Sequence, residues 1–398
     1  MGCACSFKKL DVVAPAHKRY GVPSGAKAKG AAGAAPSSPP AAGRGFCQVA
    51  PPARCGEQEQ PPAGLLVATY EPEERDREAE TPERILAEGS QLHHLRLLPW
   101  DEQDADVAGN FGLSRGGPGR GERTYADADG LPELSKRQRE ALHSWRRLPE
   151  VVSRASGAPE PVVLACPPTS RAICQGLVGD CSFLSALSAL AEYERRFREP
   201  VLSGIMHPKV DAGSGLGPVY NEYGQYGCRL FLNGTARKVV VDDRVPVRHD
   251  GRLLCAHSAC AHELWVTLLE KSFAKIMGSS YDMQGSNPGT DIFHLTGWVP
   301  ETIPLNGERT AAGRPAEDPG ASWEEVFGLA AEGYRDGRCV LCVGTSELAD
   351  AAPDAEARRH GRVEGVSTST GLVARHAYPV LDCRRLGPHR LLRLKNPW

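Results

Sequence analysis

The stretch ICQGLVGDCSFLSAL, residues 173–187, constrains the fold more than any other part of this 398-residue chain. From Cys181 onward, apolar side chains recur at i, i+1, i+4, i+7 and i+8, which is the spacing of one helix face. Those positions are Phe183, Leu184, Leu187, Leu190 and Ala191. The pattern predicts an amphipathic helix that needs a core to cover it, with a thiol at its N-terminus.

Composition divides the chain into an irregular part and a globular part. Residues 21–64 are rich in Ala, Gly, Pro and Ser, and a charged stretch follows at 71–88, so we expect residues 21–125 to be a disordered or low-complexity linker. From residue 126 the pattern is globular. Helical signals dominate 126–296 and strand signals dominate 297–398, which predicts an α+β fold with two lobes.

Several elements can be placed within the globular part. Ser135 is expected to cap a helix through Trp145, and Asn233-Gly234 is expected to join two strands of a hairpin. A second buried helix is expected over 264–276. Strands are expected at 339–343, 377–381 and 391–394.

The N-terminus, MGCACSFKK, carries the features of a lipid anchor. Gly2 and Ser6 fit the myristoylation pattern, and Cys3 and Cys5 are candidates for palmitate. Because one acyl chain binds a membrane only marginally, the second chain and the following lysines would make attachment stable. We therefore expect residues 1–20 to form a lipid-anchor segment that reaches the cytoplasmic membrane surface. The alternative is an accidental Gly2 in an irregular tip.

Charge and cysteine usage exclude several classes. A formal net charge of −2 gives no argument for nucleic-acid binding. No apolar stretch approaches the roughly 20 residues of a spanning helix, and no secretory signal is present. The odd number of cysteines, 13, without a framework, predicts free thiols in a reducing compartment. We expect a cytoplasmic protein that associates with the membrane through its N-terminus.

Three residue groups resemble metal sites, and we expect no metal at any of them. Cys339 and Cys342 form a C-x-x-C in an apolar run, which favours a buried strand because no second pair completes four ligands. Asp242 and Asp243 are interpreted as structural. The remaining cluster has spacings unlike the usual zinc motifs, and its members are Cys255, His257, Cys260 and His262.

Chemistry alone makes a cysteine hydrolase one option among several. Cys181 at a helix N-terminus is favoured as a thiolate, although Asp180 would oppose this unless it points away. Gln175 is a candidate oxyanion donor. His376 starts one predicted strand and Asn396 ends another, so the two could lie side by side, with Trp398 covering their hydrogen bond and lining the substrate site.

Seven ordered segments carry a resemblance that covers roughly residues 127–398. The segments are QGLVGDC with its helix, VVVDDRVPV, ELWVTLLEKSFAKIMGSSYD, LTGW, HAYPVLD and LKNPW, and upstream LSKRQREALHSW. In this order they resemble the papain-like core of calpain cysteine proteases. DCSF, AEYERRF, LTGW and the upstream LSKRQREALHSW are similar to the calpain-7 (PalB-like) branch in particular. Residues 1 to about 125 show no such resemblance.

The resemblance implies a fold and a reaction. It implies a papain-like core of two lobes, 126–296 with Cys181 and 297–398 with His376 and Asn396, the second lobe being incomplete. Cys181 matches the family's nucleophile, His376 its general base and acid, Asn396 the residue that orients the imidazole, and Gln175 the oxyanion glutamine. The implied activity is limited hydrolysis of protein substrates, with lobe closure bringing Cys181 to His376.

One departure from the family concerns calcium. The resemblance implies an acidic calcium ligand just before the Ile-Cys-Gln run, and this position is Ala172, whereas Glu263 keeps another acidic match. Losing a carboxylate weakens a site for a hard cation. We therefore expect no required cofactor and weak or no calcium dependence.

Two other functions remain open, as does the state of a neighbouring thiol. The chain could be a membrane-tethered calpain-like scaffold without catalysis, which the incomplete second lobe favours. It could also be another Cys–His enzyme of the transglutaminase type, although such enzymes usually orient the histidine with an aspartate. Cys174 is expected to be a buried core residue.

Overall fold

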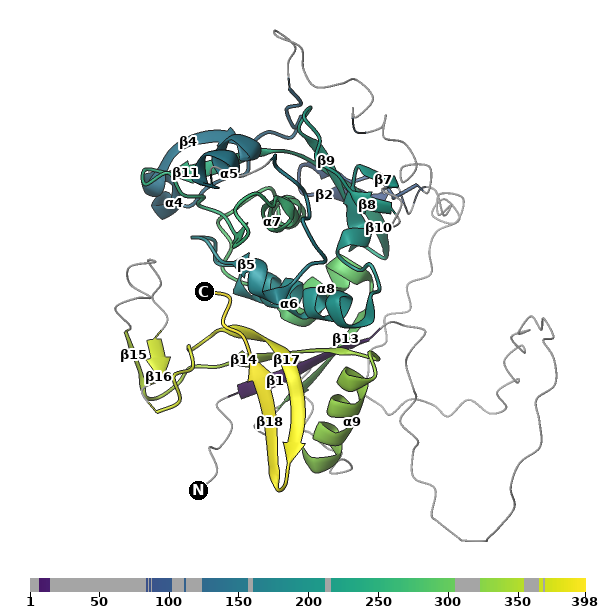
Figure 1. Cartoon of the computed structure of the whole chain (residues 1–398), viewed down its shortest axis with the longest axis vertical. Helices are drawn as coiled ribbons and strands as arrows, with labels where there is room; N and C mark the ends of the chain where they lie inside the picture. The colour runs from purple at the N-terminus through teal and green to yellow at the C-terminus, as the bar shows by residue number, and fades with distance from the viewer. Residues whose placement is uncertain are drawn as a thin grey trace, which may run out of the picture. The chain divides into compact units, whose positions relative to one another are not determined.

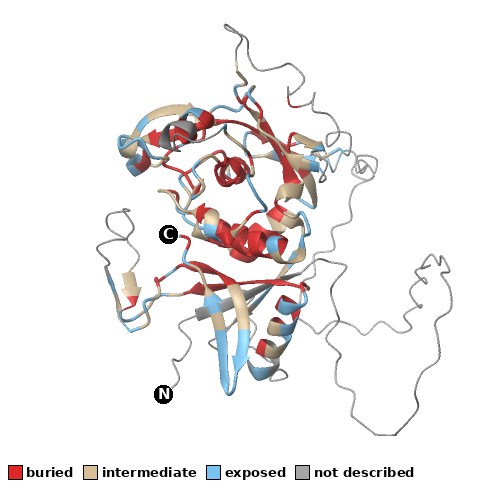
Figure 2. Cartoon of the chain, viewed as in Figure 1, coloured by how far each residue is buried: buried red, intermediate tan, exposed pale blue. Residues whose placement is uncertain are grey.

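Helix α6 (Cys181–Phe197) is the central element of the computed structural model, because residues Ser182–Glu194 are all buried. The apolar face predicted from the sequence packs into the larger hydrophobic cluster. The opposite face, which contains Ser185, contacts strands β14 (Val340–Thr345) and β17 (Ala377–Leu386). A helix that looked amphipathic is therefore covered on both sides, as the colours of Figure 2 show.

The part of the chain that the structure describes is discontinuous. Strand β1 (Phe7–Ala14) and residues Ile85–Trp398 belong to one unit, and Tyr20–Arg84 form a second unit of which only Arg84 is described. The predicted acylation sites Gly2, Cys3 and Cys5 lie outside the described residues. These are 7–14, 84, 86, 88–101, 111, 124–156, 160–211, 216–304, 323–353, 365–367 and 369–398.

The segment around Cys181 combines helices with small sheets. Strands β9 (Gln225–Leu232) and β10 (Thr235–Asp242) form a three-stranded sheet with β6 (Met206–His207). Helix α7 (Trp265–Ile276) packs on this sheet, and Phe183 of α6 stacks on Phe273 of α7 with ring centroids 4.1 Å apart. The remaining elements are α4 (Lys136–Ala141), β4 (Leu142–Arg147), α5 (Leu148–Ser156), β5 (Ile173–Cys174), β7 (Lys209–Asp211), β8 (Leu216–Pro218), β11 (Arg244–Arg248), β12 (His257–Ser258) and α8 (Pro288–Thr296), with 3₁₀ turns at Ser170–Ala172 and Ser203–Ile205.

The second half of the chain builds a five-stranded sheet that carries His376. Its order is β13-β1-β14-β17-β18, in which β13 is Val299–Pro304 and β18 is His389–Leu394. Every pair in this sheet is antiparallel. Helices α6 and α8 contact the sheet, and α9 (Trp323–Arg335) also packs against β14 and β17 (Figure 1). A short hairpin of β15 (Ala351–Pro353) and β16 (Gly365–Ser367) precedes β17.

Strand β14 is buried on both faces, which explains its unbroken apolar sequence. Val340 and Cys342 belong to the larger cluster, whereas Leu341 and Val343 belong to a second cluster beside α9. Cys339 and Cys342 are both buried, as expected for the C-x-x-C. Within the described residues no group of three or more His, Cys, Asp or Glu side chains could hold a metal ion.

Most of the predicted elements are confirmed. The β9–β10 hairpin turns at Asn233 and Gly234, whose φ angles of 46° and 76° suit a two-residue turn. Helix α7 and strands β14, β17 and β18 lie where the pattern placed them. Among the described helices, none is long and apolar enough to cross a membrane.

The helix predicted from Ser135 to Trp145 is wrong in its second half. Ser135 caps α4 in a capping box with Gln138, but the helix ends at Ala141. Leu142–Arg147 is a strand, β4, that pairs with β11. The tertiary partner outweighs local helix propensity here, because strand pairing brings Arg147 to the buried carboxylate of Asp243 at 2.8 Å.

Two parts of the N-terminal region differ from the prediction. Phe7–Ala14, expected within an anchor segment, forms strand β1 inside the five-stranded sheet. Part of the predicted linker forms a short hairpin, β2 (Gln91–Leu92) and β3 (Leu95–Arg96), and directly after it Leu98 and Trp100 make backbone hydrogen bonds to β10. Arg237 of β10 is 0% exposed and donates to Leu86 O, Ser90 Oγ and Leu97 O. Leu95, Leu97 and Phe111 are also buried.

Candidate active site

Cys181 is the first residue of α6, and Asp180 is the N-cap residue. The Asp180 side chain makes no capping bond to the helix; it hydrogen-bonds with Glu270 of α7 instead. One turn beyond Cys181, Ser185 Oγ donates to the carbonyl oxygen of Ala377 at 2.8 Å. This bond ties the first turns of α6 to the residue that follows His376.

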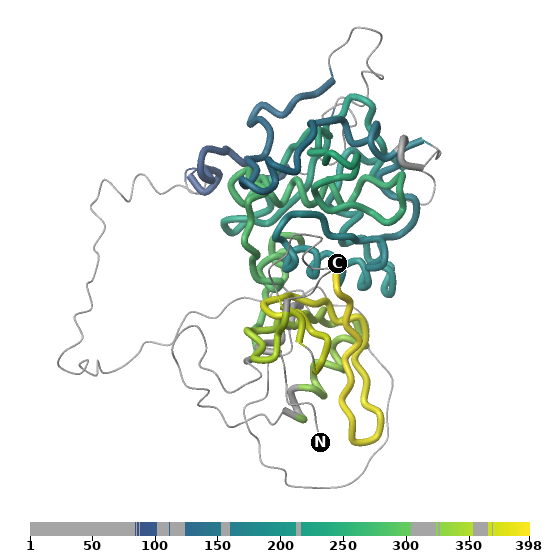
Figure 3. The backbone as a smooth tube through the Cα atoms, turned by 90° about the vertical axis from the view of Figure 1, so that its left-hand side faces the viewer, coloured from purple at the N-terminus to yellow at the C-terminus, as the bar shows by residue number. Residues whose placement is uncertain are grey.

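His376 and Asn396 lie together, as the sequence predicted. The distance from His376 Nε2 to Asn396 Oδ1 is 3.1 Å, and His376 is only 3% exposed. The indole of Trp398 lies against the imidazole with ring centroids 4.7 Å apart. Figure 3 shows how the C-terminal residues turn back from the β17–β18 hairpin toward the part of the chain that holds α6.

The partners of Asn396 fix the tautomer of His376. The backbone N–H of Trp398 donates to Asn396 Oδ1 at 3.1 Å, so this atom must be the carbonyl oxygen of the amide. A carbonyl oxygen only accepts, and His376 Nε2 must therefore carry the proton that it donates to Asn396. The neutral ring then has its lone pair on Nδ1, where it can accept a proton from a thiol.

Tyr378 contacts His376 and is close enough to Cys181 to feel its charge. Its ring meets the His376 ring edge to face at a centroid distance of 4.9 Å, and its hydroxyl accepts from the Val373 N–H at 2.8 Å. Burial raises the pKa of Tyr378, the Val373 N–H opposes this, and the charge of Cys181 raises the pKa further. Tyr378 therefore contacts the His376 ring and lies within electrostatic range of the Cys181 thiol.

Gln175 is joined to the Asn396 segment through its backbone. Its N–H donates to the Pro397 carbonyl oxygen at 3.1 Å. Its side-chain Nε2 donates to Val178 O at 2.8 Å and, over a longer 3.5 Å, to Asp180 Oδ1, while Oε1 is buried without a partner. The weaker of these two N–H contacts is the one that a developing oxyanion could replace.

Cys174 is a correction to the prediction, because it is only partly buried. It pairs through its backbone with His257 at the start of the short β5–β12 ladder. Lys395 Nζ donates to the Ile173 carbonyl oxygen at 2.6 Å beside it. Burial lowers the pKa of Lys395 to about 8, and the charge of Cys174 opposes this.

Asp180 and Glu270 form a buried carboxyl pair behind the thiol. Both Oε atoms of Glu270 accept from the Ala256 N–H at 2.9 Å. Burial raises the pKa of Glu270 well above its ordinary value, and the charge of Asp180 adds to the rise. Glu270 is therefore the member of the pair for which burial and the Asp180 charge both favour the protonated form.

Glu270→Gln is expected to stabilise the protein at neutral pH. Above about pH 4.5 the unfolded chain releases this proton and the folded chain keeps it. Stability consequently falls by up to roughly 1.4 kcal/mol per pH unit until the folded pKa is reached. Glutamine keeps one hydrogen-bond acceptor and one donor but does not titrate, so the fall in stability with rising pH should disappear. Thermal melts between about pH 5 and 8 measure this pH dependence of stability. Glu150→Gln is the control at an exposed position. An unchanged pH dependence in Glu270→Gln would contradict a protonated Glu270 carboxyl.

The acidic residues considered for metals serve other partners. Asp242 accepts from Lys271 and Arg244, and Asp243 pairs with Arg147. Glu263 accepts from the Ala165 N–H, the Ser258 hydroxyl and the Trp265 indole N–H, at 3.0, 2.7 and 3.0 Å. With alanine at position 172, the donor set does not fit the calcium site that the family implies.

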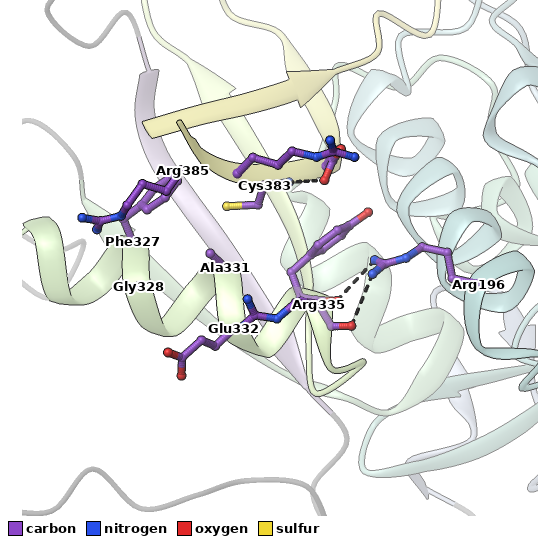
Figure 4. Close-up of a pocket in the computed structure, with 11 residues that line it drawn as sticks. Arg196, Phe327, Gly328, Ala331, Glu332, Arg335, Cys383 and Arg385 are labelled. Atoms are coloured by element: carbon purple, nitrogen blue, oxygen red, sulfur yellow. Dashed lines mark hydrogen bonds and ion pairs between the residues drawn. The ribbon is translucent and has the colours of Figure 1, made fainter. Parts of the chain in front are cut away.

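A cavity of about 740 Å³ lies away from these residues, between α9 and β17. Figure 4 shows Arg196 reaching into it from α6. The guanidinium lies 4.3 Å over the Tyr334 ring and donates to the carbonyl oxygens of Tyr334 and Arg335. These carbonyls end α9, so Arg196 caps a helix C-terminus and has a structural role. None of the predicted catalytic residues lines this cavity.

Comparison with known proteins decides the family. The profile described as "Calpain family cysteine protease" matches residues 125–398. This chain is a calpain family member. It is 33% identical to "Calpain-7" of Homo sapiens over 274 residues, which is 69% of this chain and 30% of that protein. It is 28% identical to "Calpain-like protease palB" of Emericella nidulans over 319 residues, 79% of this chain and 33% of that protein.

The comparisons confirm the predicted family and its α+β protease core. This calpain-type chain spans about a third of the length of the two relatives. The roles assigned to Cys181, His376, Asn396, Gln175 and Trp398 remain predictions, and their geometry is the support on which a proposal can be built.

Sequence reasoning missed several residues of the site. Tyr378 follows His376 by two residues on one strand, and this spacing places two side chains on the same face. Ser185 follows Cys181 by four residues on a helix, again on one face. These periodicities could have identified both. Thr345 and Lys395 act through backbone contacts with distant segments, for which the sequence gives no local signal.

Proposed function

We propose that this chain carries the catalytic core of an intracellular calpain-like cysteine endopeptidase that performs limited proteolysis. The hydrogen bond from His376 Nε2 to Asn396 Oδ1 at 3.1 Å carries the proposal, because it leaves Nδ1 to exchange protons with a thiol. The position of Cys181 at the first residue of α6, whose Ser185 hydroxyl donates to the carbonyl oxygen of Ala377 next to His376, supports it as the nucleophile.

The proposed reaction is an acyl transfer in two steps. Cys181 gives its proton to His376 Nδ1, and the thiolate attacks the carbonyl carbon of the scissile peptide bond. The amide of Gln175 and the backbone N–H of Cys181 donate to the oxyanion. His376 returns the proton to the leaving amine, which leaves a thioester on Cys181. Water, deprotonated by His376, then hydrolyses the thioester.

The wider setting is part of the same proposal. We expect the papain-like two-lobed arrangement, with lobes 126–296 and 297–398 and an incomplete second lobe, and Trp398 lining the substrate site. We expect proteolysis without a need for the calcium site that lacks a carboxylate at residue 172. Nine described cysteines are free thiols, which suits the cytoplasm. An acylated N-terminus would hold the protease at the cytoplasmic membrane surface.

Labelling with an epoxide or vinyl-sulfone probe tests the proposal on the whole chain. We expect modification at Cys181, unchanged by calcium or a chelator, and its loss in Cys181→Ala. Cys174→Ala is the matched control, since it removes a nearby, partly buried thiol and should leave labelling intact. Labelling of Cys181 no faster than of the other cysteines would favour a calpain-like scaffold without catalysis.

A further inference from the structure

Strand β1 lies inside the sheet that carries His376. Its residues Lys9–Ala14 pair with β13, and Phe7 and Lys9–Val13 pair with β14, both antiparallel. The ladder to β14 has an irregularity between Phe7 and Lys9. The N-terminal strand therefore supplies backbone partners to two strands that come from near residues 300 and 340.

No other strand in the described part of the sheet could take over this pairing. Neighbouring strands lie about 4.8 Å apart, so β13 and β14 stand roughly two such spacings from one another. Direct hydrogen bonds between them would require one strand to move by a whole spacing. Without β1, both strands would present bare edges, and β14 would be held only by β17.

The end of β14 holds the backbone of His376. Thr345, its last residue, is 8% exposed and pairs with Phe7 of β1. Its N–H donates to the His376 carbonyl oxygen at 2.9 Å, and its Oγ1 accepts from the His376 N–H at 2.9 Å. The same hydroxyl donates to the Val373 carbonyl oxygen at 2.6 Å. Thr345 thus fixes both backbone groups of the histidine and the loop before it.

We propose that β1 and Thr345 position the His376 imidazole for the reaction. β1 fixes the end of β14, and Thr345 passes this constraint to the backbone of His376 from which the imidazole extends. Thr345 touches no reacting atom, so it is a positioning residue. The inference rests on the proposed proteolytic function for its kinetic consequence, but the seating of β1 can be measured without any reaction.

The N-terminal position of β1 links this device to the predicted lipid anchor. Gly2 precedes Phe7 by five residues, and an extended chain spans at most about 3.6 Å per residue. If Gly2 carries an acyl chain in a bilayer, the first residue of β1 lies within about 18 Å of it. Gly2→Ala would remove this attachment and leave the strand in place, so membrane binding and histidine positioning can be separated.

The first test uses Val12→Pro in the whole chain. Proline removes a backbone donor from the middle of β1, and Ala16→Pro, beyond the strand, is the matched control. Hydrogen exchange followed by mass spectrometry should show faster exchange in β13 and β14 for Val12→Pro only. The rate constant for labelling Cys181 should fall by on the order of 10²-fold. Native protection and native labelling in Val12→Pro would overturn the proposal.

The second test leaves β1 intact. Thr345→Val removes the hydroxyl that holds His376 and should lower the labelling rate by roughly 10-fold to 10²-fold, with β1 and β13 still protected. It should also shift the pH at which labelling falls to half, which a loss of folded protein would not do. Thr345→Ser should restore both. An unchanged pH profile in Thr345→Val would overturn the role of Thr345. If Cys181 fails to label in the unaltered chain, the proteolytic function fails while exchange still decides the seating of β1.

Discussion

His376→Ala is expected to lower the rate of peptide-bond hydrolysis by on the order of 10³-fold or more. The imidazole is asked both to take the thiol proton and to protonate the leaving amine, and no described side chain beside it replaces either step. His376 contacts Asn396, Trp398 and Tyr378 through its ring. The measurement is hydrolysis of an unfolded protein substrate, together with the rate of Cys181 labelling.

The hairpin provides a matched control for this variant. His389 is exposed on β18, so His389→Ala removes an imidazole without touching the site. Asn396→Ala should give a smaller loss, roughly 10²-fold, because it loosens the ring without removing it. Thermal melts should remain close to those of the unaltered chain in all three variants. Equal activity in His376→Ala and His389→Ala would exclude His376 as the base.

Asp242→Asn is expected to destabilise the folded protein by about 3–5 kcal/mol. Asp242 Oδ1 lies 2.5 Å from Lys271 Nζ, and Oδ2 lies 2.5 Å from the Arg244 guanidinium. The side chains of Asp242 and Lys271 are 0% and 2% exposed. Burial lowers the pKa of Lys271, and the charge of Asp242 opposes this. An amide in place of the carboxylate removes the ion pair of the buried ammonium and leaves it to the weaker influence of the Asp127 and Asp243 charges.

Denaturant unfolding measures this cost, and Asp250→Asn is its control. Asp250 pairs with Arg248 at 3.0 Å but is 42% exposed, so its loss should cost less than about 1 kcal/mol. Burial raises the pKa of Asp242, but Lys271, the Asp127 N–H and Arg244 together outweigh burial, so the net shift is downward. Its stabilisation is present above the ordinary carboxyl pKa and is lost as the pH falls through the folded value. A small cost at neutral pH would mean that Lys271 is solvated or neutral.

The predicted elements that were confirmed depend on local pattern. Cys181 at the start of α6 follows from helical spacing, and the Asn233-Gly234 hairpin follows from a turn that both residues favour. His376 and Asn396 were placed at strand ends by short apolar runs, and their meeting followed from antiparallel pairing. In each case the signal lies within about 20 residues of the feature that it predicts.

The errors arise where a distant partner decides the structure. The local pattern of Leu142–Arg147 predicts a helix. The segment is a strand because β11 provides backbone hydrogen bonds and Asp243 pairs with Arg147. The segment FKKLDVVA is too short and too charged to be predicted as a central strand. Its central position depends on pairing with β13 and β14. Nothing in the local sequence distinguishes Thr345, because its role depends on hydrogen bonds to the backbone of His376, which lies far along the chain. Such pairings are set by the tertiary fold, which single-sequence patterns do not encode.

Arg237 bears on where the folded unit begins. The family profile starts at residue 125, yet this fully buried guanidinium donates to acceptors among residues 86–97. A chain shortened to begin at residue 125 would lose several hydrogen-bond acceptors of Arg237, a buried charge that water cannot reach. The smallest autonomous protease core of this chain is therefore wider than the family profile, and the alignment with "Calpain-like protease palB", which covers 79% of the chain, likewise extends upstream of residue 125.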